Sequence, residues 1–140
     1  MINPIKFLPS LLLMLVAGCA SIPETPNSAP APNFATVYFY RTHFAPGGAV
    51  AFDIQDNGID LGALPDGSYF QYRANPGVHL FTLTTESTAQ QRLNLQPGAT
   101  YYIRADTGKS PLHFQPSLQV VYELQGKTEI QNLNELNYHE

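Results

Sequence analysis

The fold class is decided by residues 69–103, which read YFQYRANPGVHLFTLTTESTAQQRLNLQPGATYYI. Two Pro-Gly pairs in this stretch, Pro76-Gly77 and Pro97-Gly98, each precede a run rich in β-branched and aromatic residues. Proline presets φ at about −65° and glycine tolerates positive φ, so each pair is typical of a type II turn. The runs at 78–84 and 99–103 have the composition of half-buried strands. The stretch therefore predicts antiparallel β-structure.

Further strands are predicted on both sides of this stretch. The large apolar residues Val50, Phe52 and Ile54 alternate with Ala51, Asp53 and Gln55. The Asn57-Gly58 pair that follows suits a type I′ hairpin turn. The same kind of evidence predicts strands at 35–41, 59–61, 69–73, 93–95 and 118–124. Because about eight short strands are separated by turn signals, we predict an all-β fold, an antiparallel β-sandwich.

Near the C-terminus the spacing of apolar residues changes. Ile130, Leu133 and Leu136 lie three residues apart, as on one face of a helix. Thr128 and Gln131 have the spacing of a capping box. These features predict a short C-terminal helix that begins near Thr128.

The N-terminal segment predicts secretion and lipid attachment. Residues 7–16 are mostly apolar and follow Lys6, but they are shorter than the roughly 20 apolar residues that a bilayer-spanning helix needs. They fit a signal peptide. The run ends in Leu15-Val16-Ala17-Gly18-Cys19, which is similar to a bacterial lipobox, and Cys19 is the only cysteine in the chain. We therefore predict acylation of Cys19; the alternative is an ordinary signal peptide with an incidental cysteine.

The chain divides into three predicted parts. Residues 1–18 are the lipoprotein signal peptide. Residues 19–33 hold the lipidated cysteine and a segment with four prolines and no apolar period, which is typical of a semi-extended tether. Residues 34–140 form the β-sandwich domain.

Charge narrows the list of partners. The formal net charge is −4, and processing would remove the basic Lys6. This excess of negative charge argues against binding of nucleic acid and against electrostatic adhesion to anionic lipid. Membrane attachment then depends on the acyl chains of Cys19, of which stable anchoring needs at least two. Ala20 follows the cysteine, and in enterobacterial-type sorting an aspartate there would favour the inner membrane. We therefore predict the inner leaflet of the outer membrane, facing the periplasm.

Candidate metal ligands are scattered. The histidines lie far apart in the sequence without metal-ligand spacing, so no metal and no cofactor is expected. They are His43, His79, His113 and His139. His79 has the strand parity of Phe81 and Leu83. We predict a buried, neutral imidazole that is hydrogen-bonded to the backbone.

Candidate catalytic residues are equally isolated. The serines weighed as nucleophiles lack a Gly-x-Ser-x-Gly elbow; they are Ser68, Ser87, Ser110 and Ser117. The carboxylates Asp53, Asp56 and Asp60 bracket a hairpin and could supply oxygen ligands for calcium. The later glutamate of an EF-hand loop is missing, however, and turn chemistry accounts for Asp56. We expect no histidine within hydrogen-bond reach of a serine or carboxylate inside a pocket.

An outward row of aromatic side chains is the remaining candidate site. Strand parity puts one set inward, namely Val37, Phe39, Tyr101 and Ile103, and the other set outward, namely Tyr38, Tyr40, Tyr102 and Arg104. Tyrosine and arginine are enriched at interfaces, so the outward set predicts a contact surface for an envelope protein or a glycan. The alternative is that these rings serve as good strand formers that cover a sheet edge.

A succession of short motifs resembles a known family. In order they are Val37-Tyr38-Phe39-Tyr40-Arg41, Asp56-Asn57-Gly58, Leu61-Gly62-Ala63-Leu64, Gly67-Ser68-Tyr69-Phe70, Pro76-Gly77-Val78-His79 and Pro97-Gly98-Ala99-Thr100-Tyr101-Tyr102-Ile103-Arg104. This order and spacing is similar to the bacterial envelope family called domain of unknown function 2846, from about Ala35 to Arg104 and more weakly to Leu124. The resemblance implies an Ig-like or prealbumin-like sandwich in a secreted protein or lipoprotein, and it implies no activity.

Two functions remain at this point. The first is a lipid-anchored, non-enzymatic module that binds or scaffolds another envelope component. The alternative is an envelope hydrolase or a metal-binding protein, whose site would assemble from the loops at 43–48 and 106–116.

Overall fold

The computed structural model describes residues 32–43, 50–107 and 115–138. The elements in chain order are β1 (Ala35–Arg41), β2 (Phe52–Asp56), β3 (Ile59–Leu64), β4 (Ser68–Ala74), β5 (Gly77–Thr84), β6 (Thr88–Leu95), β7 (Thr100–Thr107), β8 (Pro116–Val121), α1 (Glu123–Ile130) and β9 (Asn134–Glu135).

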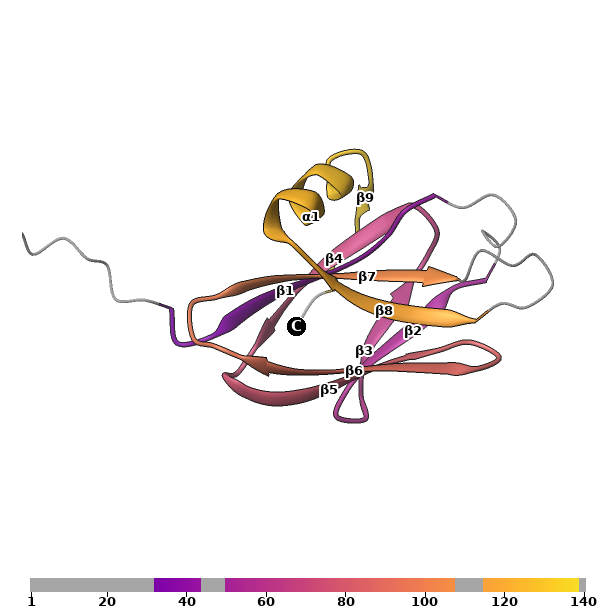
Figure 1. Ribbon diagram of the computed structural model, residues 1–140. Helices are drawn as coiled ribbons and strands as arrows, with labels where there is room; N and C mark the ends of the chain where they lie inside the picture. The colour runs from indigo at the N-terminus through magenta and orange to yellow at the C-terminus, as the bar shows by residue number, and fades with distance from the viewer. Residues whose placement is uncertain (1–31, 44–49, 108–114, 139–140) are drawn as a thin grey trace, which may run out of the picture.

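The strands form two sheets that face each other (Figure 1). One sheet has the order β8-β7-β1-β4-β9 and the other has the order β3-β2-β5-β6. The prediction of an all-β sandwich with a short C-terminal helix is confirmed. The first sheet is mixed rather than purely antiparallel, because β1 pairs in parallel with β7 and β9 pairs in parallel with β4.

The core lies between the two sheets and follows the alternation of the sequence. Val37 and Phe39 of β1 are fully buried, as are Phe81 and Leu83 of β5 on the opposite sheet. The rings of Phe39 and Phe81 meet edge to face, with their centroids 5.0 Å apart. Each such buried side chain stabilises the fold by about 1.5–3 kcal/mol. With no second cysteine in the sequence, this apolar core carries the stability of the domain.

The two Pro-Gly pairs form different turns. Gly98 has φ of 74°, and the Ala99 amide donates to the Gln96 carbonyl at 3.2 Å, so the predicted type II turn is confirmed there. Gly77 also has positive φ, 128°, but it already begins β5. The Asn75 carbonyl accepts a hydrogen bond from His79 Nε2 at 2.8 Å. The His79 side chain thus supports the turn at Pro76-Gly77.

The helix begins earlier than predicted. α1 starts at Glu123, so Leu124, expected in a strand, lies in the helix. Thr128 is inside the helix and donates to the Leu124 carbonyl at 2.8 Å, so the predicted capping box is wrong. The only buried residue of α1 is Gly126. This helix is therefore positioned by a close approach at its glycine rather than by an apolar face.

The two sides of the sandwich are closed differently. On one side β8 packs against β6 of the opposite sheet. On the other side β3 and β4 face each other at the edges of their sheets, with only the two-residue β9 beyond β4. Within the described part of the chain, no helix is long and apolar enough to cross a membrane.

Candidate binding site

Several predicted site residues lie outside the described ranges. Cys19 and most of its tether precede residue 32, and Ser110, His113 and His139 fall in other undescribed segments. Most of the two loops considered for a hydrolytic or metal site, residues 44–49 and 108–114, lies there as well. The lipidation of Cys19 and the loop-borne site stay predictions.

The outward aromatic set is brought together as parity predicted. The parallel pairing of β1 with β7 aligns Tyr38 with Tyr102 and Tyr40 with Arg104. The rings of Tyr38 and Tyr102 are stacked, with 5.0 Å between their centroids and 9° between their planes. These four residues, which we call the outer aromatic face, point away from the core between the sheets.

However, α1 covers the outer aromatic face (Figure 1). Gly126 lies directly against the Tyr102 ring, and Tyr102 is only 4% exposed. Tyr40 is fully buried, and its hydroxyl donates to Glu129 of α1 at 2.5 Å. The prediction of an exposed surface is therefore wrong for Tyr40 and Tyr102. The face is occupied by a helix of the same chain.

Charge holds this helix in place. Glu129 accepts hydrogen bonds from Tyr40 and from Arg104 Nη1, the latter at 3.3 Å. Burial alone would raise the pKa of Glu129, but the hydrogen bonds from Tyr40 and Gln125 and the charge of Arg104 lower it below its usual value. Burial, reinforced by the nearby Glu129 carboxylate, raises the pKa of Tyr40 well above its usual value. The tyrosine is thus a neutral donor to a carboxylate.

A second buried cluster lies inside the sandwich. His79 Nδ1 lies 2.7 Å from Asp56 Oδ2, and Nε2 lies 2.8 Å from the Asn75 carbonyl. His79 and Asp56 are 9% and 4% exposed. Both ring nitrogens therefore lie within hydrogen-bond distance of an oxygen atom. The expected burial and backbone hydrogen bond of His79 are confirmed, and the neutral state of the ring stays a prediction.

Tyr72 connects this cluster to the surface. Its hydroxyl donates to Asp56 Oδ2 at 2.9 Å. Burial, together with the hydrogen bond to the Asp56 carboxylate and its charge, raises the pKa of Tyr72 to about 12. Turn chemistry does not account for Asp56, contrary to expectation. The signal was present in the sequence, because Asp56 continues the inward alternation of Phe52 and Ile54.

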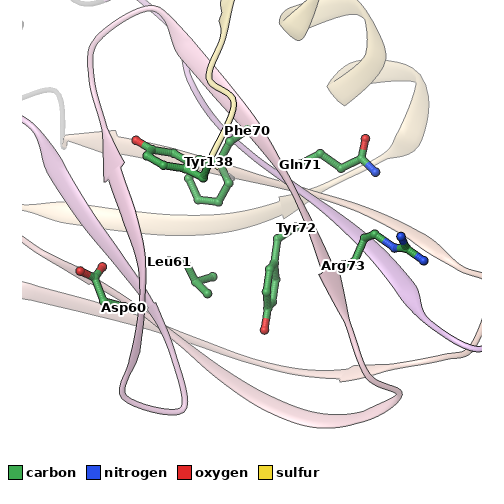
Figure 2. Close-up of a pocket in the computed structure, with 7 residues that line it drawn as sticks. All are labelled: Asp60, Leu61, Phe70, Gln71, Tyr72, Arg73 and Tyr138. Atoms are coloured by element: carbon green, nitrogen blue, oxygen red, sulfur yellow. The ribbon is translucent and has the colours of Figure 1, made fainter. Parts of the chain in front are cut away.

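A pocket of about 450 Å³ opens between β3 and β4 (Figure 2). Its lining comprises Asp60, Leu61, Phe70, Gln71, Tyr72, Arg73 and Tyr138. Leu61 comes from β3, and Phe70 and Tyr72 project from the inward side of β4. We call this opening the lateral pocket. No local sequence pattern indicates this pocket, because its walls come from two strands of different sheets that are each paired with other strands.

The C-terminal tail forms one end of the lateral pocket. After β9 the chain crosses from β4 towards β3, where the Tyr138 hydroxyl donates to the Ala63 carbonyl. The Tyr138 ring packs edge to face on Phe70, with 5.1 Å between centroids, and lies 2.8 Å from where a Cβ on Gly62 would be. Tyr138 is 45% exposed, so it borders the pocket without sealing it.

The other candidate residues are dispersed. His43 Nδ1 lies 3.1 Å from Asp66, and the Ser68 hydroxyl donates to the Pro65 carbonyl at 2.6 Å. Two histidines contact carboxylates, His43 at Asp66 and His79 at Asp56, and neither histidine lines the lateral pocket. Asp60 accepts from the Gly62 amide at 3.0 Å and stands apart from the buried Asp56. The described residues contain no cluster of three or more histidine, cysteine or acidic side chains suited to a metal ion.

The fold and the pocket define the class of protein: a small all-β sandwich domain that is open along one side. The family model described as "Protein of unknown function (DUF2846)" matches residues 31–116, and the chain belongs to this family. The match includes β1 to β7 and ends as β8 begins, so that α1, β9 and Tyr138 follow it in the sequence. None of the curated proteins matches the chain.

Proposed function

We propose that this protein is a lipid-anchored, non-enzymatic module of the bacterial envelope that binds a partner in the lateral pocket. The sandwich would serve as a rigid frame, with the acyl chains on Cys19 keeping it at the membrane. The partner is another envelope component within reach of the tether.

The observation that carries this proposal is the contrast between the pocket wall and the groups behind it. Leu61, Phe70 and Tyr138 present apolar surface to the opening. The polar groups behind them are already paired, with Tyr72 and His79 both bonded to Asp56. A concave, largely preformed, partly apolar site of this kind favours binding.

Photo-crosslinking in living cells tests the pocket. A photoactivatable phenylalanine at Asp60, on the pocket rim, should yield a discrete adduct, whereas the same residue at Asp53 should not. The two positions are matched, because both are exposed and lie on the β2–β3 hairpin. Filling the pocket with Leu61→Phe should abolish the adduct from position 60. Equal adducts from both positions, or an adduct that Leu61→Phe leaves unchanged, would contradict the proposed site.

Membrane fractionation tests the anchor. Cys19→Ser should leave the protein unacylated and move it from the membrane to the soluble or unprocessed fraction, because the acidic chain has no electrostatic attraction to anionic lipid. In a density gradient the wild-type protein should follow the outer membrane, as Ala20 predicts. Retention of the Cys19→Ser variant on membranes after a high-salt wash would argue against lipid anchoring.

A further inference from the structure

One edge of β4 is only partly paired. The Asn134 amide donates to the Gly67 carbonyl at 2.9 Å, and the Leu136 amide donates to the Tyr69 carbonyl at 2.8 Å. In a strand, the backbone groups of alternate residues point to the same side. The backbone groups of Gln71 and Arg73 therefore point to the same edge as those of Gly67 and Tyr69.

β9 ends before it reaches these groups. Its pairing with β4 covers only Ser68 and Tyr69, and the chain then turns towards β3. In the described part of the molecule, β4 has no other strand on that side. The amide and carbonyl groups of Gln71 and Arg73 thus form an open ladder, and both residues line the lateral pocket.

The open ladder and the pocket lie beside each other (Figure 2). The Gln71 and Arg73 side chains point away from the pocket, while the Tyr72 side chain between them projects to the other side of β4, the side on which Leu61 lies. A strand added along this edge would alternate in the same way. Its outward side chains would lie beside Gln71 and Arg73, and the intervening side chain would enter the pocket between Leu61 and Tyr72.

We propose that the lateral pocket binds an extended peptide segment of an envelope protein, by strand addition to β4 at Gln71–Arg73 with one apolar side chain inserted in the pocket. This inference rests on the proposed function and names the chemistry of its partner. Regularly spaced main-chain donors and acceptors select a polypeptide, and β9 already pairs with the same edge as a short parallel strand. The ligand would continue that interface.

The length of the open edge favours a single peptide strand over a second copy of this chain. The free stretch extends only from Gln71 to the end of β4 at Ala74, because β9 and the Tyr138 tail occupy the rest of the edge. Pairing between two sheets uses long, flat, unobstructed edges. Three or four residues beside a bordering tail match a short peptide instead.

The test uses heptapeptides selected from a random library on the detergent-solubilised full-length protein and counter-selected on its Leu61→Phe variant. Gln71→Pro removes the outward amide, and Gln71→Ala keeps it while removing the same side chain. We expect Gln71→Pro to weaken binding about tenfold or more, because proline removes a main-chain hydrogen bond and also obstructs the edge, and we expect Gln71→Ala to change binding less than about threefold.

The peptide supplies an independent measurement if Gln71→Pro fails to fold. Methylation of single backbone nitrogens should weaken binding about tenfold at alternate positions only, because every second amide would face β4. Uniform tolerance of methylation, or equal effects of Gln71→Pro and Gln71→Ala, would overturn strand addition. So would the recovery of no pocket-dependent peptide, or a dimer in sedimentation that Gln71→Pro abolishes.

The crosslinking experiment separates this inference from the proposed function. If Leu61→Phe abolishes the adduct from position 60 but folded Gln71→Pro leaves it intact, the pocket binds a partner without strand addition. The inference would then be wrong while the proposed function would stand. If neither variant affects the adduct, both are wrong.

Discussion

The outer aromatic face lies on the five-stranded sheet, and the lateral pocket opens between β4 of that sheet and β3 of the other. The C-terminal segment approaches both surfaces. On the outer aromatic face, α1 packs closely against the sheet: Gly126 contacts Tyr102, and Glu129 accepts hydrogen bonds from Tyr40 and Arg104. At the pocket, the tail crosses the opening with one ring, Tyr138, which remains 45% exposed. One surface is covered by its own chain, and the other is left open.

This difference teaches that residue type alone does not identify a binding surface. The outer aromatic face has the tyrosines and the arginine that are enriched at interfaces, and its occupant is a helix of the same molecule. The lateral pocket has a less distinctive composition, but its main-chain edge and its apolar wall remain accessible. What covers a surface decides whether it is available to a partner.

The largest effect is expected behind the pocket wall. Asp56→Ala should destabilise the protein by about 2 kcal/mol or more, because it removes the carboxylate that both His79 and Tyr72 contact, and each buried polar group left without a partner costs about 1–3 kcal/mol. Urea unfolding followed by circular dichroism measures this loss. Asp53→Ala on the same strand is the control and should change stability by less than about 0.5 kcal/mol, because Asp53 is exposed. Similar losses in both variants would show that the buried pair does not support the pocket.

A smaller effect is expected where α1 meets the outer aromatic face. A Cβ at Gly126 would overlap the Tyr102 ring, so Gly126→Ala should cost about 1–3 kcal/mol even though alanine favours helix. Hydrogen exchange should show faster exchange of the α1 amides. The control Leu124→Ala, at a helix position that is 80% exposed, should have little effect. Unchanged exchange in Gly126→Ala would mean that the glycine contact does not hold the helix.

The smallest effect is a dependence of the same contact on acid. The pKa of Glu129 is lowered in the folded protein, so its charged form stabilises the fold above its unfolded value of about 4.5. This contribution should disappear as the pH falls from there through the folded pKa. The free energy of unfolding of the wild type should therefore fall more steeply below about pH 4.5 than that of Glu129→Gln. Parallel pH curves would show that the charge of Glu129 does not stabilise the contact between α1 and the sheet.

Local patterns predicted the strands well because a strand buried on one face carries a period of two. The predicted strand at 35–41 coincides with β1, and the grouping of Val37 with Phe39 and of Tyr38 with Tyr40 is confirmed. Asn57 and Gly58, with φ of 48° and 83°, form the hairpin turn expected of that pair. These features depend on near neighbours in the chain, so the sequence displays them directly.

The helix start and both surfaces could not be predicted in this way. α1 has no apolar stripe, since its docking depends on Gly126 and on the charge of Glu129, and neither produces a period. Asp56 and His79 lie on the neighbouring strands β2 and β5. The alternation along each strand indicated that both side chains point inward, but it did not indicate that they contact each other. The lateral pocket could not be predicted because Tyr138, which borders it, is distant in sequence from Ala63, to which it is hydrogen-bonded.

The sequence by itself determined the all-β class, the strand faces, the turns and the prediction of a lipid anchor at Cys19, because each is written in local composition and spacing. Only the tertiary structure decided which surface is free. The order of the strands leaves β3 and β4 on one open side, and α1 covers the outer aromatic face whereas Tyr138 only borders the lateral pocket. Contacts between residues far apart in sequence govern that choice, and no local pattern encodes them.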